Sequence, residues 1–179
     1  MNLARVLEVI AASTLIIYAI SALITLLTPI YIFRGDIDGY LSLSGYSLFG
    51  FGSEIRSQMA ESAMLYTAPI YASALFALAS SLLSILRGSP WLLLSASGIA
   101  VMSTGILRGV LYILGLVASA VSKDPSHQTA AGRIIFQGTE VYIGTGYIAS
   151  QIALVTPYVS LALAVIITFF ALKKQMHGV

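Results

Sequence analysis

The chain has 179 residues, of which 58% are hydrophobic and only 9% are charged. A soluble globular domain carries about 25% charged residues, so nine basic and seven acidic side chains cannot coat a water-exposed surface of this size. The composition excludes a conventional soluble domain and indicates an integral membrane protein.

Long uncharged stretches predict four transmembrane helices. A span needs about 20 consecutive apolar residues, and two uncharged stretches that flank Arg108 join into one such helix. The predicted spans cover residues 6–33, 62–86, 91–121 and 147–172. The expected fold class is an all-α membrane protein, a bundle of four transmembrane helices, with residues 1–179 forming a single integral membrane domain.

Basic residues in the short connections predict the orientation. Arg5, Arg87, Lys173 and Lys174 face only one acid, Glu8, whereas the two long loops carry more acidic than basic residues. Basic residues near span ends stay on the cytoplasmic side, so we expect a multi-pass plasma-membrane protein with both termini cytoplasmic. The small basic excess is a topology signal and does not indicate nucleic-acid binding.

The two long outer loops, residues 34–61 and 122–146, contain patterns typical of β-hairpins. Apolar and serine residues alternate on both sides of Ser44-Gly45, and Gln137-Gly138 separates two β-prone runs. Two hairpins that pair into a small sheet would stabilise each other. The alternative is a pair of irregular loops with glycine-rich tips.

A tight turn at residues 87–90 predicts that the second and third spans pack as an antiparallel pair. Small residues line both spans, and residues 105–109 fit the GxxxG pattern that lets helices approach closely in lipid. The predicted helix-packing residues are Ser73, Ala77, Ser81, Gly98, Gly105 and Gly109. Either packing within one chain or contact with a second copy or a partner subunit explains them.

Four spans, cytoplasmic termini and a longer first outer loop are similar in plan to claudin-type tetraspan proteins. That first outer loop lacks the family's Trp and paired Cys motif, because the chain has no Cys and its one Trp is Trp91. The resemblance is confined to topology, and no residue role follows from it. The sequence has no Cys and only one Asn, a composition that favours a thermophilic source.

The usual catalytic motifs are missing from the sequence. It has no Walker A loop, no GxSxG elbow and no HExxH motif, and His127 and His177 lack metal-ligand spacing. Asp36 and Asp38 resemble the start of a calcium loop without its later ligands, which favours an ordinary acidic turn. We therefore expect neither an enzyme nor a bound metal or cofactor.

Arg108 is the one charge placed inside a span. Counted from Trp91 at about 1.5 Å per residue, it lies about 25 Å along the helix, in the outer third of a hydrocarbon layer about 30 Å thick. A charge in a span normally pairs, faces protein or marks a pathway. The alternative is that Arg108 extends to the outer headgroups.

Three prolines favour a cavity near Arg108. Pro29, Pro69 and Pro157 are predicted to kink three helices in the outer half of the bundle and to free backbone carbonyls. The expected ligand- or lipid-binding residues are Arg108, Tyr112, Tyr66, Tyr158, Glu61 and Glu140. Such a pocket would suit a lipid headgroup, a quinone head or a small anion, whereas an interfacial aromatic belt explains the tyrosines without a cavity.

The expected function is that of a non-enzymatic accessory subunit or assembly factor of a larger membrane complex. Its partners would be the lipid bilayer and other membrane subunits or further copies of the chain. The alternatives are a small channel or carrier, or a lipid- or quinone-binding subunit of a respiratory complex.

Overall fold

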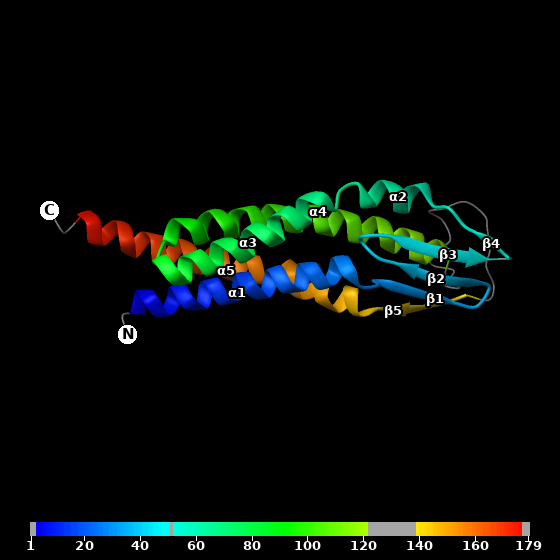
Figure 1. The fold of residues 1–179 in the computed structure, drawn as a ribbon, viewed down its shortest axis with the longest axis horizontal. Helices are drawn as coiled ribbons and strands as arrows, with labels where there is room; N and C mark the ends of the chain where they lie inside the picture. Colours follow the sequence, from blue (N-terminus) through cyan, green and yellow to red (C-terminus); the bar gives the residue numbers. More distant parts are fainter. Residues whose placement is uncertain (1–2, 51, 122–138, 177–179) are drawn as a thin grey trace. The chain divides into compact units, whose positions relative to one another are not determined.

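The computed structural model describes residues 3–50, 52–121 and 139–176, without the side chains of residues 174–176. Its elements, in chain order, are α1 (Leu3–Leu27), β1 (Tyr31–Arg34), β2 (Ile37–Leu41), β3 (Tyr46–Gly50), β4 (Ser53–Glu54), α2 (Gln58–Met64), α3 (Ala68–Arg87), α4 (Pro90–Val121), β5 (Glu140–Ile143) and α5 (Thr145–Met176) (Figure 1). Four helical segments of the described chain are long and apolar enough to cross a membrane, with α2 and α3 counted together. The protein is thus mostly helical with a small antiparallel sheet, as the sequence predicts.

The first helix ends earlier than predicted. Helix α1 stops at Leu27, and residues 31–34 form strand β1 instead of the last turn of a span. Pro29 lacks a backbone N–H and disfavours a helical conformation at Thr28, so the helix cannot continue. Thr28 closes the helix, because its amide and its hydroxyl both donate to the Ile24 carbonyl, at 2.9 and 2.7 Å.

The second predicted span is divided into two helices. Ser57 caps α2 by accepting a hydrogen bond from the Ala60 amide, and residues 65–67 separate α2 from α3. Pro69 falls in the first turn of α3, where its missing N–H has no intrahelical acceptor to lose. At the other end, Gly88 adopts φ +66° and ends α3, so that Pro90 can start α4.

The chain divides into two compact units. The first, here called the helical unit, comprises Met1–Leu23, Pro69–Gly105 and Gln151–Val179. The second, here called the sheet unit, comprises Ile24–Ala68 and Ile106–Ser150. A single integral membrane domain over residues 1–179 stays a prediction.

Buried hydroxyl groups connect the helices inside the helical unit. The Ser73 hydroxyl of α3 lies 2.6 Å from that of Tyr18 on α1 and 2.8 Å from that of Ser103 on α4. Because Ser73 and Ser103 lie at similar distances from the 87–90 turn, this contact confirms that α3 and α4 run antiparallel. In an apolar surrounding such hydrogen bonds hold helices together, since an unpaired hydroxyl there is costly.

A second hydroxyl contact joins α5 to the same core. The Ser160 hydroxyl lies 2.7 Å from that of Ser97 on α4 and donates to the Ala11 carbonyl of α1 at 3.1 Å. These serines are buried among alanines, which let the helix backbones approach closely. Small residues and direct hydrogen bonds therefore fill the interior of the helical unit.

The sheet unit contains a five-stranded antiparallel sheet in the order β4-β3-β2-β1-β5 (Figure 1). The predicted hairpin around Ser44-Gly45 is confirmed: β2 and β3 pair, and the Ser42 hydroxyl donates to the Gly45 carbonyl at 2.6 Å. The predicted turn at Gln137-Gly138 lies outside the described residues. Beyond it, β5 pairs with β1, so the two outer segments form one sheet.

The two faces of this sheet differ in burial. Phe33, Ile37, Leu41 and Leu48 point to one face and are buried, in agreement with the strand register. Parts of α2 and α4 lie against this face, because Tyr46 bonds to α2 and the Tyr31 hydroxyl lies 3.5 Å from a Cβ built on Gly115 of α4. The opposite face carries most of the exposed strand residues, although Ile143 of β5 is exposed on the first face.

Candidate functional site

Arg108 lies on the exposed side of α4. Tyr112, one turn further along, is 68% exposed, so the two side chains share the outward face of the helix. No hydrogen bond or ion pair joins Arg108 to another described residue. The Arg108 side chain is thus exposed on α4 and forms no polar contact with another described residue.

The predicted counter-charges of Arg108 have other partners. The Tyr46 hydroxyl donates to Glu61 Oε1 at 2.9 Å and accepts a hydrogen bond from the Ser57 amide at 3.0 Å. Partial burial, followed by the Glu61 carboxylate, raises the pKa of Tyr46 above its usual value. Glu61 therefore connects α2 to the sheet.

Glu140 is part of a separate group on the sheet. The Tyr142 hydroxyl donates to its carboxylate, and this hydrogen bond is the main cause that raises the pKa of Tyr142. Arg34 pairs with Glu140 across β1 and β5 and lies 5.9 Å from the centre of the Tyr142 ring. The Glu140 carboxylate is therefore engaged by Tyr142 on the sheet.

The remaining residues of the predicted cavity are two tyrosines and three prolines. Tyr66 and Tyr158 are both exposed, and the Tyr158 hydroxyl lies 3.1 Å from that of Thr104. Pro157 lies in the interior of α5, whereas Pro29 follows the end of α1 and Pro69 lies in the first turn of α3. Two of the three predicted kinks are thus corrected to helix boundaries.

The small residues predicted to pack helices fall into two groups. Ser73, Ala77 and Ser81 of α3 are buried in the helical unit. Gly98, Gly105 and Gly109 of α4 are not buried, and a Cβ built on any of them would meet no atom of another segment within 4 Å. Within the described chain, therefore, no helix packs at these three glycines.

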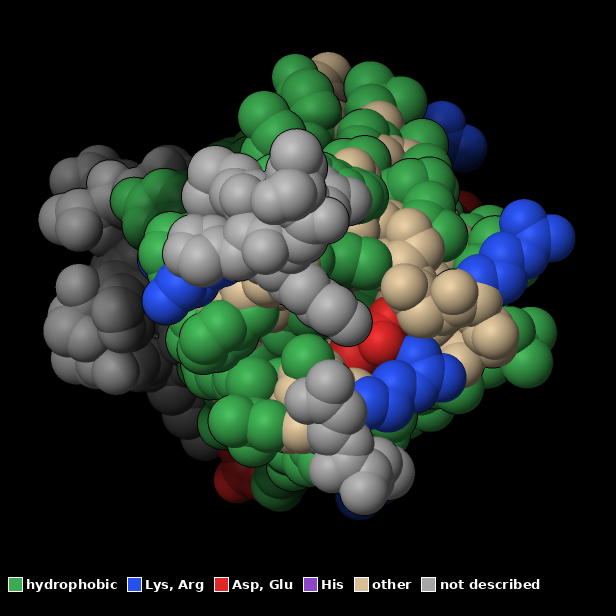
Figure 2. Space-filling model, turned by 90° about the vertical axis from the view of Figure 1, so that its left-hand side faces the viewer, with side chains coloured by type: hydrophobic (Ala, Val, Ile, Leu, Met, Phe, Trp, Pro, Cys, Tyr) green, Lys and Arg blue, Asp and Glu red, His purple; other side chains and the backbone are tan. Residues whose placement is uncertain are grey.

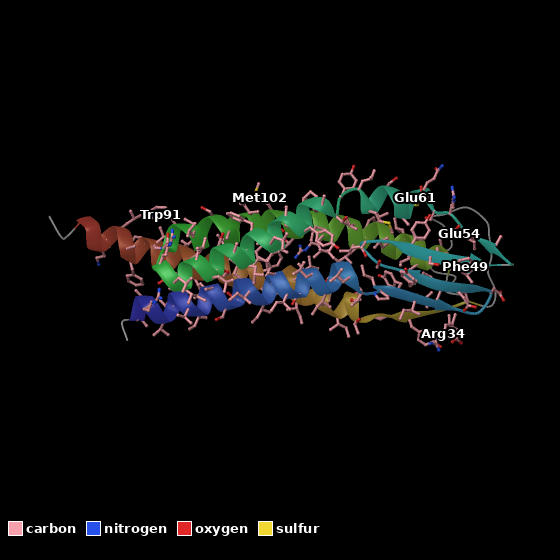
Figure 3. All side chains as sticks on the ribbon, in the orientation of Figure 1. Arg34, Phe49, Glu54, Glu61, Trp91 and Met102 are labelled. Atoms are coloured by element: carbon pink, nitrogen blue, oxygen red, sulfur yellow. The ribbon has the colours of Figure 1, made fainter. Side chains whose placement is uncertain are left out.

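The exposed face of the sheet combines aromatic and charged side chains. Tyr40, Phe49 and Tyr142 are 41%, 53% and 47% exposed on β2, β3 and β5. Arg34, Asp38, Glu54 and Glu140 point to the same face by register and are also exposed. In Figure 3 the labelled Arg34 side chain projects away from the strands. We call these seven residues the free sheet face.

The helical unit contains a partly buried ion pair that the sequence alone does not single out as a possible site. Arg5 Nη1 lies 2.7 Å from Glu8 Oε2, and the Ser84 hydroxyl donates to Glu8 Oε1 at 2.8 Å. Arg5 also donates to the Ile85 carbonyl. Figure 2 looks onto this end of the unit and shows a small acidic patch beside basic side chains in a mainly apolar face. The available signal was an acid, Glu8, inside the predicted first span.

No group of three or more His, Asp or Glu side chains gathers as metal ligands in the part of the chain that the structure describes. Asp38 accepts a hydrogen bond from the Gly35 amide at 3.1 Å, which is the geometry of an ordinary turn. His127 and His177 lie outside the described residues.

Comparison with known protein families finds no profile that matches the chain, and comparison with curated proteins finds no similar sequence.

Proposed function

We propose that this protein is a non-enzymatic accessory subunit or assembly factor of a larger membrane complex, and that its free sheet face binds a protein partner. In this proposal the chain spans the plasma membrane four times, with both termini cytoplasmic and the sheet outside. The observation that carries the proposal is the free sheet face, with three large aromatic side chains exposed on its strands.

The composition of the free sheet face suits a protein interface. Lipid contact explains exposed apolar residues on the spans, but it does not explain Phe49 and Tyr40 on strands that follow the end of α1. Aromatic side chains are the usual energetic anchors of interfaces, and charged residues around them supply a polar rim. Arg34, Glu54 and Glu140 form such a rim here.

Helix α4 offers a second contact surface in the sheet unit. Arg108 and Tyr112 point outward, and Gly109 between them leaves room for a close helix. A charge in lipid costs about 2.5–3.5 kcal/mol at the centre of a span, and a carboxylate on a neighbouring helix would offset this cost. A second copy would bring another Arg108 to the same depth, so a different subunit is the better match.

Purification from native membranes in mild detergent tests the proposal. We expect one partner to copurify at fixed stoichiometry with the wild type, and its yield to fall about tenfold or more in a Tyr40→Ser/Phe49→Ser variant, as loss of an interface anchor predicts. Met59→Ser, at an exposed position on α2, is the matched control and should keep the partner. A homogeneous monomer or homo-oligomer in every preparation would contradict the proposal.

A further inference from the structure

The helical unit contains a cavity of about 450 Å³ where α1 and α4 begin and α5 ends. Its lining includes Arg5, Glu8, Gly88, Ile167, Phe170 and Ala171. This volume lies within the range of about 300–1,000 Å³ that is typical of small-molecule sites. Apart from the Arg5–Glu8 pair the side chains of this lining are apolar, so the cavity matches an amphipathic ligand.

The hydrogen bonds around Glu8 hold the charged part of this cavity in place. The Glu8 residue is only 6% exposed, because Ser84 and Arg5 both donate to its carboxylate. The Arg5 side chain is 37% exposed and also donates to the Ile85 carbonyl. A guanidinium has five N–H donors, so donors remain on Arg5 beyond those that these two acceptors take.

The charge at this end of the helical unit favours an anion. The described charged residues at the ends of its helices are Arg5, Arg87 and Lys173, against the single acid Glu8. Arg87 precedes Gly88, which lines the cavity, and a Cβ built on Gly88 would lie 3.4 Å from Arg5 Nη1. An anion that enters the cavity is therefore attracted by the excess of basic residues, and the Arg5 guanidinium can bind it.

We propose that this cavity binds an anionic glycerophospholipid, with the headgroup phosphate on Arg5 and the start of an acyl chain along Ile167 and Phe170. Helices that cross a membrane end at the level of the lipid headgroups, and α1 begins and α5 ends beside this cavity. Guanidinium groups bind phosphate through two parallel hydrogen bonds. Glu8 is a positioning residue, because its carboxylate accepts a hydrogen bond from Arg5 and so fixes the guanidinium at the cavity.

Native mass spectrometry of the full chain in mild detergent, titrated with dioleoyl phosphatidylglycerol, tests this proposal. We expect one retained lipid per chain in the wild type and about tenfold weaker retention of dioleoylglycerol, which lacks the phosphate. Equal retention of these two probes would overturn the proposal, because the phosphate would then contribute nothing.

Two variants test whether phosphatidylglycerol binds in this cavity. Arg5→Gln/Glu8→Gln removes both charges without leaving a buried carboxylate unpaired, and Ala171→Phe fills the cavity without changing its charge. Each should weaken phosphatidylglycerol retention about tenfold, whereas Arg34→Gln on the sheet should not change it. If either of the first two variants retained phosphatidylglycerol as well as the wild type, the lipid would not bind in this cavity and the proposal would be wrong. Because these readouts need no protein partner, they are independent of the function proposed above.

Discussion

Replacing Gly39 with Ala should open the pairing of strands β2 and β3. Gly39 has φ +143°, and a Cβ built there would lie 1.8 Å from the Ser47 carbonyl oxygen. Real Cβ contacts are essentially never shorter than 3.0 Å, so the two strands would have to move apart by more than 1 Å. The pairing hydrogen bonds at this point would then be lost.

The expected cost follows from these two effects. A non-glycine residue in this backbone region costs about 1–2 kcal/mol, and losing two neighbouring strand hydrogen bonds costs about 1–3 kcal/mol more. The total is about 2–5 kcal/mol, which corresponds to at least a thirtyfold faster amide exchange in β2 and β3.

Hydrogen exchange read by mass spectrometry measures this effect on peptides from the sheet. Gly45→Ala in the same hairpin is the matched control, because a Cβ there meets nothing within 4 Å and its φ is not in the left-handed region. We expect the control to stay within about 0.5 kcal/mol of the wild type. Equal exchange in the two variants would show that the register of β2 and β3 is not the one described here.

Two further predictions concern single hydroxyl groups. The pKa of Tyr46 is raised in the folded protein, so its hydrogen bond to Glu61 stabilises the sheet unit at pH values below about 10. This stabilisation is lost as the pH rises through the folded-state pKa of Tyr46. Hydrogen-exchange measurements should detect the loss of stability at alkaline pH in the wild type but not in Tyr46→Phe. Tyr18 is 1% exposed and bonded to Ser73, so Tyr18→Phe should lower the stability of the helical unit by about 1 kcal/mol, seen as a lower thermal midpoint in detergent. Tyr158→Phe, at a 45% exposed position, should shift that midpoint less, and an equal shift would contradict the role of the buried contact.

Hydropathy predicts the four apolar helices well, but it cannot say where the first one ends. Residues 30–33 are apolar and β-branched or aromatic, so they suit the end of a span and a buried strand equally well. Pairing with β2, which follows β1 directly, and with β5, which lies far along the chain, decides for the strand. The hairpin at Ser44-Gly45 was predictable because its turn and its alternation are local.

The candidate sites also depend on contacts between segments that hydropathy does not predict. The position of Arg108 along α4 follows from the sequence, but the direction of its side chain depends on which side of α4 packs against other helices. Serines such as Ser97 and Ser103 occupy that buried side, and hydropathy does not distinguish it. The Arg5–Glu8 pair is visible in the sequence as an i, i+3 pair, yet Ser84, which completes it, lies 76 residues away.

Site-specific photo-crosslinking in intact membranes tests the proposed role of the free sheet face most directly. A photoreactive amino acid at position 49 should crosslink to one partner polypeptide of defined mass, whereas the same amino acid at position 59 on α2 should not. Crosslinks from position 49 to lipid or to a second copy of the chain alone would contradict the accessory-subunit account.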